Sequence, residues 1–224
     1  MQSEELLDRL AKAVLDLDLR ETGPMTREAL AAKIPPMRII MEGLSRGMRL
    51  VGEKFKCGEM YMPEVLVACD AYYAGLKVVK PLIEGSADIG RRGTIVLGTI
   101  FGDIHTVGKD VAAPVFQAAG YNVIDLGVDA PPERFINAIR AHKPQLVGLG
   151  TYMTATFMHT RDMVQAFEKA GVRSQVKIIC GGPAVDANRA RSLGADDASD
   201  DAWEAVEKMD RLVEQLSAAK GGNR

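Results

Sequence analysis

After residue 93 the chain alternates between short apolar runs and amphipathic stretches, and before residue 85 it does not. The apolar runs predict buried strands over 94–100, 121–126, 145–150 and 176–180, with a weaker fifth near 197–198. The stretches between and after them predict helices over 107–119, 131–142, 157–170, 186–193 and 201–218. Strands that alternate with helices favour a parallel sheet covered on both faces, because each parallel connection must cross over the sheet.

Residues 1–85 predict helices only. Ser3 can cap a first helix, which Thr22-Gly23-Pro24 is expected to end. Further helices are predicted over 28–33, 37–55 and 63–83. Together these segments predict a Rossmann-like (flavodoxin-like) α/β fold, a doubly wound parallel sheet preceded by an all-α four-helix bundle. The expected boundaries are 1–85 for the helical bundle, 86–92 for a glycine-rich hinge and 93–224 for the sheet domain.

Composition excludes several classes of protein. The 224 residues are 47% hydrophobic and 26% charged, which is typical of a globular protein with a real core. A net charge of −2 argues against a nucleic-acid surface. No apolar run approaches the ~20 residues that a membrane span needs. Three widely spaced cysteines argue for a reducing cytoplasm and against a disulfide framework.

The segment Asp103-Ile104-His105-Thr106-Val107-Gly108 follows the first predicted strand. In an open parallel sheet, ligands bind beyond the carboxyl ends of the strands, so His105 is placed where a ligand is expected. A carboxylate two residues before a histidine can hold one ring nitrogen while the other faces a metal. The alternative is structural: His105 as a hydrogen-bonded loop residue and Asp103 as the cap of the next helix.

Two further loops open at the same edge. Gly150, Thr151, Tyr152 and Thr154 follow the third strand, and Gly181-Gly182 follows the fourth. These residues predict a slot lined by glycines and hydroxyls, although turn and cap chemistry explains the same residue types. Neither a Gly-x-Gly-x-x-Gly fingerprint nor a P-loop is present, so a standard nucleotide fold is unsupported.

These motifs resemble those of corrinoid (cobalamin-binding) methyl carriers, such as the cobalamin-binding module of methionine synthase and the corrinoid proteins of methanol, methylamine and O-demethylase systems. The resemblance covers almost the whole chain. It implies that cobalamin binds base-off, with its own lower base in the slot, and that His105 ligates the cobalt. Asp103 and Thr156 would complete a relay that tunes this histidine. The residues that the resemblance implies in cofactor binding are Gly102, Asp103, Ile104, His105, Thr106, Val107, Gly108, Gly150, Thr151, Tyr152, Thr154, Gly181, Gly182, Phe55, Met62 and Val65.

Two features qualify the resemblance. Residues 51–65 resemble the family's cap motif, in which an aromatic and a large apolar residue cover the upper face of the corrin; Phe55 and Met62 hold those positions. Ordinary helix packing is the alternative for both. The chain also departs from the family, which often has Ser-x-Leu where this chain has Gly150-Thr151-Tyr152. The serine hydroxyl is missing, Thr151 is the candidate substitute, and the contacts of the nucleotide tail are left open.

The resemblance implies a methyl carrier that is not catalytic alone. Cob(I)alamin would take a methyl group, and methylcobalamin, as methyl-Co(III), would pass it on. The implied partners are a substrate-specific methyltransferase, a tetrahydrofolate or coenzyme M methyltransferase, and a reductive activator that rescues oxidised cofactor such as hydroxocobalamin. The methyl donor, the acceptor and the oligomeric state are left open.

Three alternatives remain at this point. A cobalamin-binding subunit of a carbon-skeleton mutase shares the histidine motif but does not need the helical cap. A cobalamin-dependent sensor or regulator would normally carry a DNA-binding or signalling domain. A plain Rossmann-like domain would bind no corrinoid.

Overall fold

The computed structural model describes residues 2–83, 91–183 and 185–221. The chain divides into two compact units, one comprising Met1–Ile89 with Gln117–Ala119 and the other Gly90–Phe116 with Gly120–Arg224. Most of the expected hinge, 86–92, lies outside the described residues. Within the described residues, no helix combines the length and the apolar character that a membrane crossing requires.

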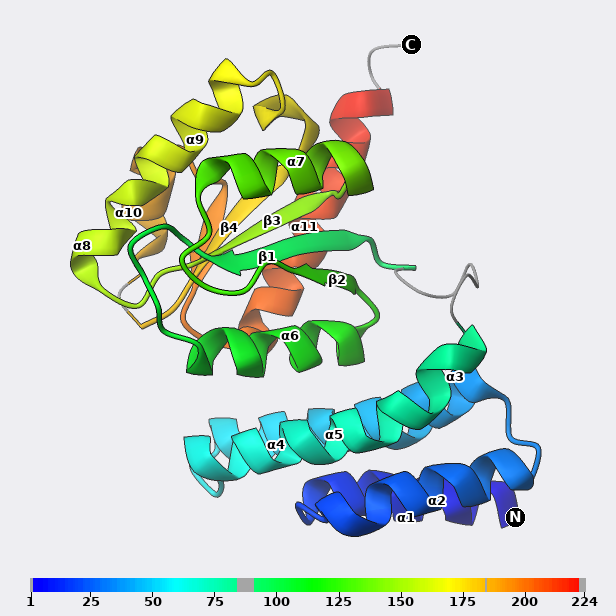
Figure 1. The fold of residues 1–224 in the computed structure, drawn as a ribbon. Helices are drawn as coiled ribbons and strands as arrows, with labels where there is room; N and C mark the ends of the chain where they lie inside the picture. The colour runs from blue at the N-terminus through cyan, green and yellow to red at the C-terminus, as the bar shows by residue number, and fades with distance from the viewer. Residues whose placement is uncertain (1, 84–90, 184, 222–224) are drawn as a thin grey trace. The chain divides into compact units, whose positions relative to one another are not determined.

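The first unit is a helical bundle, as predicted (Figure 1). Helix α1 packs against α2 and α4, and α2 packs against α5. The third predicted helix is a continuous run of a short α3, a π-helical stretch η1, and α4. The elements are α1 (Gln2–Leu15), α2 (Leu19–Ala31), α3 (Pro36–Arg38), η1 (Ile39–Leu44), α4 (Ser45–Lys56) and α5 (Met62–Ile83).

The break after the first helix was predicted at the wrong place. It lies at residues 16–18, where Leu17 adopts a left-handed conformation with φ of 64°. The Asp18 amide donates back to the Ala13 carbonyl at 2.8 Å, and the Asp18 side chain then accepts from the amide of Glu21 at 3.1 Å. Asp18 therefore caps a new helix, and Pro24 lies inside it. A proline inside a helix costs one intrahelical hydrogen bond and some steric strain, which tertiary packing can outweigh.

The second unit is a five-stranded parallel sheet in the order β2-β1-β3-β4-β5, and its strands fall where the sequence predicts them. The predicted helix over 157–170 corresponds to α9, and a short helix, α8, precedes it. The elements are β1 (Thr94–Thr99), α6 (Val107–Ala119), β2 (Asn122–Asp125), α7 (Pro132–His142), β3 (Leu146–Gly150), α8 (Thr154–Phe157), α9 (His159–Lys169), η2 (Arg173–Gln175), β4 (Lys177–Gly181), α10 (Ala187–Ser192), β5 (Asp197–Ser199) and α11 (Ala202–Gly221).

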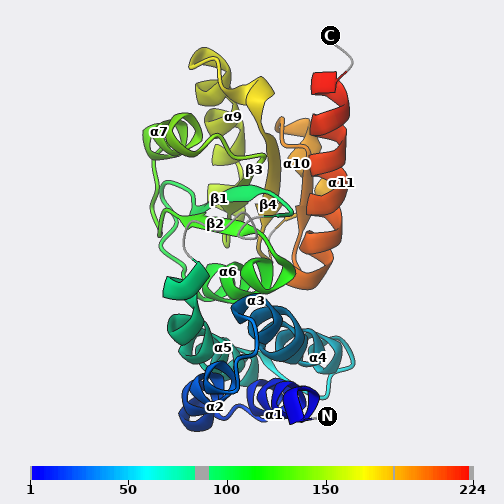
Figure 2. The same ribbon diagram turned by 90° about the vertical axis from the view of Figure 1, so that its right-hand side faces the viewer.

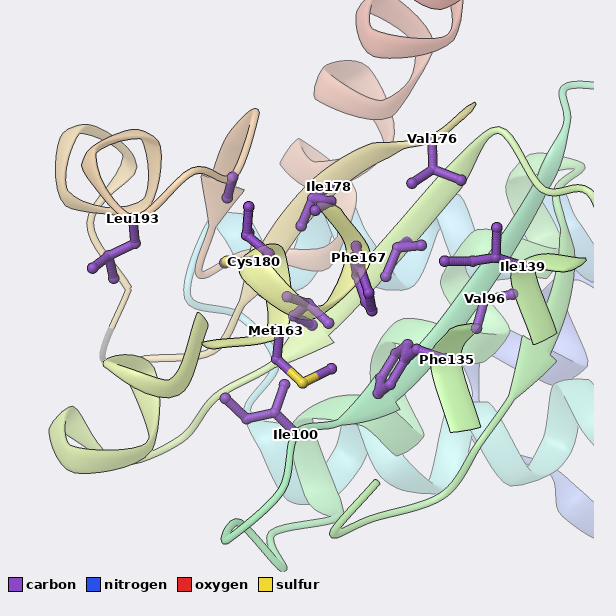
Figure 3. Close-up of a cluster of buried hydrophobic side chains, with 14 of the residues drawn as sticks. Val96, Ile100, Phe135, Ile139, Met163, Phe167, Val176, Ile178, Cys180 and Leu193 are labelled. Carbon is purple, nitrogen blue, oxygen red and sulfur yellow. The ribbon is translucent and has the colours of Figure 1, made fainter. Parts of the chain in front are cut away.

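Helices cover both faces of this sheet, with α7 and α9 on one side and α6 and α11 on the other (Figures 1 and 2). Alternate strand residues such as Val96 and Ile178 pack with Phe135 of α7 and Phe167 of α9 in one buried cluster (Figure 3). Because successive strand side chains point to opposite faces, the central strands are apolar throughout.

Strand register sets the position of the loops. Thr99 at the end of β1 pairs with Gly150 at the end of β3, and Gly150 pairs with Gly181 at the end of β4. The loops that follow these three strands therefore open side by side at the carboxyl edge of the sheet.

The helical bundle depends on close approach of α1 and α4. A Cβ atom placed on Gly47 would lie 2.6 Å from the Cβ of Val14 and 2.7 Å from the carbonyl oxygen of Ala11. We expect Gly47→Ala to lower the free energy of unfolding by roughly 1–3 kcal/mol through overpacking, which exceeds the gain of about 1 kcal/mol in helix propensity. Urea denaturation measures the change.

The matched control is Gly23→Ala in α2. A Cβ there would lie 3.6 Å from its nearest neighbour, the carbonyl oxygen of Ala74, which is ordinary contact. We expect this variant to be as stable as the parent or more so. Equal urea midpoints for the two variants would contradict the packing argument.

Candidate functional site

The carboxylate of Asp103 lies at the centre of the site and is fully buried. Its Oδ1 accepts from the backbone amide of His105 at 3.1 Å and lies 2.7 Å from the ring Nδ1 of the same residue. Its Oδ2 accepts from the amide of Tyr152 at 2.8 Å and from the hydroxyl of Thr156 at 2.7 Å. One carboxylate therefore joins the loop after β1 to the loop after β3 and to α8.

These contacts fix the charge of Asp103 and the tautomer of His105. Burial raises the pKa of Asp103, but the hydrogen bonds from Tyr152, Thr156 and His105 outweigh it and hold the pKa below its usual value. An ionised carboxylate can only accept hydrogen bonds. The Nδ1 atom of His105 must therefore carry the proton, which leaves the lone pair on Nε2.

Hydrogen bonds fix His105 through its backbone and its Nδ1 atom, while about half of its side chain is exposed. Its side chain is 53% exposed, and its backbone carbonyl accepts from the hydroxyl of Thr99 at 3.0 Å. Neighbouring Ile104 is 73% exposed. The loop thus presents a fixed Nε2 lone pair beside apolar surface, which suits a metal that arrives within an organic ring.

Sequence reasoning missed Asp129. This residue follows β2 with φ of 49°, and its Oδ1 accepts from the amide of Gly102 at 2.8 Å. Its own amide donates to the carbonyl of Asp103 at 3.0 Å. Gly102 itself has φ of 84°, which favours glycine at this turn. The position of Asp129 after a strand that ends at the same edge was the available signal.

His159 was missed as well. Its Nδ1 atom lies 3.1 Å from the carbonyl oxygen of Phe101, in the same loop as His105. Phe101 is 55% exposed. Nothing in the sequence links residues 101 and 159, because α8 and the start of α9 bring them together.

The loops that follow β3 and β4 contact each other beside the site. The Thr151 amide donates to the Gly181 carbonyl at 2.8 Å, and a Cβ on Gly182 would lie 2.1 Å from the Thr151 carbonyl oxygen. Gly182 has φ of 126°, so both its conformation and its surroundings require glycine. The buried Oγ1 atom of Thr151 has no hydrogen-bond partner among the described residues.

Other predicted residues lie either at the carboxyl edge of the sheet or in the helical unit. Thr106 and Thr154 are exposed at the carboxyl edge of the sheet, and only the backbone of Val107 is described. In the helical unit, Phe55 is half-buried, Met62 is 39% exposed and Val65 is fully buried in the bundle. Contact of these three residues with a corrin stays a prediction.

Comparison with known proteins identifies the family. Two models described as B12 binding domains match the chain, one over residues 93–207 and the other over residues 6–80. The chain belongs to the B12-binding corrinoid proteins. This confirms the resemblance that the motifs indicated, and the cofactor is cobalamin.

Named relatives of this corrinoid protein match most of its length. The trimethylamine corrinoid protein of Methanosarcina barkeri is 39% identical over 207 residues, which cover 92% of this chain and 95% of the relative. The dimethylamine corrinoid protein of the same organism is 33% identical and covers 95% of this chain and 100% of the relative.

Solved structures agree on the fold. A cobalamin-binding protein from Desulfitobacterium hafniense matches with a TM-score of 0.72 at 30% identity, covering 92% of this chain and 98% of that one. The methanol:cobalamin methyltransferase complex of Methanosarcina barkeri matches with a TM-score of 0.80 at 26% identity, covering 94% and 80%.

The described residues of this corrinoid protein fit the cofactor. Of the described residues at this edge, His105 would hold the cobalt of cobalamin, because its Nδ1 is paired with Asp103 and its side chain is exposed. The unpaired hydroxyl of Thr151 is a buried polar group whose desolvation costs about 1–3 kcal/mol until a partner arrives. Gly182 adds close backbone approach beside it.

The carboxylate of Asp103 can be tested by Asp103→Asn. An amide has one acceptor oxygen in place of two, so two of the four donors around Asp103 lose their partner. We expect the free energy of unfolding to fall by about 1–3 kcal/mol, the cost of unsatisfied buried groups. Urea denaturation of the apoprotein measures it.

The control is Asp162→Asn, at an exposed position early in α9. A surface substitution of this kind should change stability by less than about 0.5 kcal/mol. If the two variants were equally stable, the buried carboxylate would not be the anchor that its contacts indicate.

Proposed function

We propose that this corrinoid protein carries a methyl group on cobalamin between two methyltransferases, with cobalamin bound base-off and His105 as the lower ligand of cobalt. One observation supports this most directly: the buried Asp103 carboxylate accepts from Nδ1 of His105 at 2.7 Å and leaves Nε2 free to ligate. When bound, cobalamin supplies a cobalt centre that accepts and releases methyl groups.

In this proposal the chain tunes the ligand. Asp103 holds the Nδ1 proton of His105, which orients the ring and makes Nε2 a better donor. Thr156 holds the second carboxylate oxygen, and its hydroxyl also lies 3.0 Å from the carbonyl oxygen of Met153. Since a hydroxyl has one hydrogen, Thr156 can shift its donation between these two acceptors when the proton count of the pair changes.

We further propose a methylated amine as the methyl donor. Two relatives that span the chain are named as trimethylamine and dimethylamine corrinoid proteins. A separate methyltransferase would bring the methyl group to the cofactor. A second methyltransferase, acting on tetrahydrofolate or coenzyme M, would remove it, and a reductive activator would restore oxidised cofactor.

The helical domain is proposed as a cap. Residues 1–85 would cover the upper face of the corrin, with Phe55 and Met62 nearest to it, and residues 86–92 would act as the hinge. Exposure of 39% leaves Met62 accessible for such a contact. A cap that opens for each partner would protect a reactive cofactor from water between encounters.

The ligand assignment can be tested by isotope labelling. The chain has three histidines, so we would grow it with nitrogen-15 histidine and load it with natural-abundance cobalamin. After reduction to cob(II)alamin, electron paramagnetic resonance should show a two-line nitrogen splitting from the axial ligand. Natural-abundance protein should show three lines.

Variants of each histidine complete the test. His105→Ala should lose the labelled splitting, whereas His159→Ala and His142→Ala should retain it. A three-line pattern from labelled protein would mean that the cofactor's own base remains on cobalt, and the His105 assignment would be wrong.

The donor is tested with the protein loaded with cob(I)alamin. Trimethylamine with a trimethylamine methyltransferase should consume the cob(I)alamin absorption at least about tenfold faster than methanol with a methanol methyltransferase, a difference of about 1.4 kcal/mol. His105→Ala is the variant control, because its loss of ligand should slow the productive reaction. Faster reaction with the methanol pair would overturn the amine proposal.

A further inference from the structure

The side chain of Tyr152 lies in the slot between the glycine loops. A Cβ on Gly108 would lie 2.3 Å from Cε1 of the ring, a Cβ on Gly150 3.3 Å from Cε2, and a Cβ on Gly182 3.4 Å from Cδ1. Gly108 belongs to α6, Gly150 ends β3, and Gly182 follows β4. Backbone therefore approaches the ring from three sides, and a side chain on Gly108 would collide with it.

The hydroxyl of Tyr152 lies at the start of α6, where a Cβ on Gly108 would be 2.6 Å from it. Burial raises the pKa of the phenol, and the nearby backbone amide of Lys109 lowers it by less. Lys109 lies in the first turn of α6, where amides have no partner within the helix. The ring and its hydroxyl thus fill space beside amides that a bound ligand can use.

Glycine at position 150 leaves room for the aromatic ring of Tyr152. A serine at position 150 would place its Cβ 3.3 Å from the Tyr152 ring and 3.3 Å from the Thr99 hydroxyl, which is tighter than usual contact. Glycine at 150 removes that crowding. The departure from Ser-x-Leu is therefore one coupled change, in which a small residue makes room for a large aromatic one.

We propose that Tyr152 occupies the slot meant for the nucleotide tail of cobalamin and must swing out before the tail can enter. The tail ends in a planar aromatic base, the same shape that the glycine cradle now holds. Two rings cannot share this space, because the cradle already contacts the tyrosine on three sides. The proposal rests on base-off binding, as proposed above.

Displacement makes Tyr152 a selectivity residue. A corrinoid without a nucleotide tail does not need the slot, so Tyr152 should not slow its binding. A complete cobalamin must displace the Tyr152 ring from the glycine cradle before it is seated. The unpaired Thr151 hydroxyl, next to Tyr152 in the chain, is a polar group that the arriving tail can satisfy.

The experiment compares two corrinoids on the full-length apoprotein. Stopped-flow absorption would follow the binding of aquacobalamin and of diaquacobinamide, which lacks the tail, to the parent, to Tyr152→Leu and to Met153→Leu. We expect Tyr152→Leu to speed aquacobalamin binding about tenfold, because no aromatic ring then has to leave the cradle before the tail enters. It should leave diaquacobinamide binding within about twofold. The conservative Met153→Leu change, in the same loop, should alter neither rate.

A stability measurement tests the position of the ring without any cofactor. Gly108→Ala should destabilise the parent, because the new methyl group collides with the ring. It should destabilise Tyr152→Leu clearly less. Additive effects of the two substitutions in urea denaturation would overturn the placement of the ring.

Failure of this inference can be told from failure of the proposed function. Equal aquacobalamin rates for the parent and Tyr152→Leu, with base-off spectra in both, would overturn the tyrosine proposal and leave His105 as ligand. Retention of the cofactor's own base on cobalt in both proteins would overturn both proposals, because no tail would enter the slot.

Discussion

The buried carboxylate of Asp103 is the interaction on which the site depends. A buried charge is tolerated only when it is well hydrogen-bonded, and four donors within 3.1 Å surround this one. All four donors come from His105, Tyr152 and Thr156, the residues around which the site is built. The same contacts set the histidine tautomer, the backbone path after β3 and the start of α8. Removing the charge would therefore loosen the whole edge of the sheet.

Around the Asp103 carboxylate, the site is built mainly from glycines, which allow other groups to approach the backbone closely. The register that pairs Thr99, Gly150 and Gly181 brings three loops together, and Gly108 and Gly182 allow backbone to approach closely. The anchor fixes one ring, that of His105, while the glycines leave room for another. Tyr152 belongs to both parts, because its amide binds the carboxylate and its side chain fills the space. In the two proposals, cofactor selection at the slot and the orientation of His105 as ligand are thereby joined through Tyr152.

Sequence patterns predicted the sheet unit closely because its strands are apolar on both faces and its helices lie between them. The predictions failed where one local sequence pattern was compatible with two different structures. Thr22-Gly23-Pro24 was expected to end the first helix, but Leu17 in a left-handed conformation and the Asp18 cap end it earlier. Pro24 is instead tolerated inside α2. Likewise, residues 154–156 were expected to be loop, yet they belong to α8, which carries Thr156 to Asp103.

By itself the sequence determined the parallel sheet, the helical bundle and the motif that places His105 at the sheet edge, because these depend on local periodicity and on strand order. Only the tertiary structure decided which groups meet there. Asp129 and His159 reach the loop of His105 through the folding of distant segments, and Tyr152 lies against Gly108 because register sets β3 beside β1. Such contacts join residues far apart in the chain, so no local pattern could have predicted them.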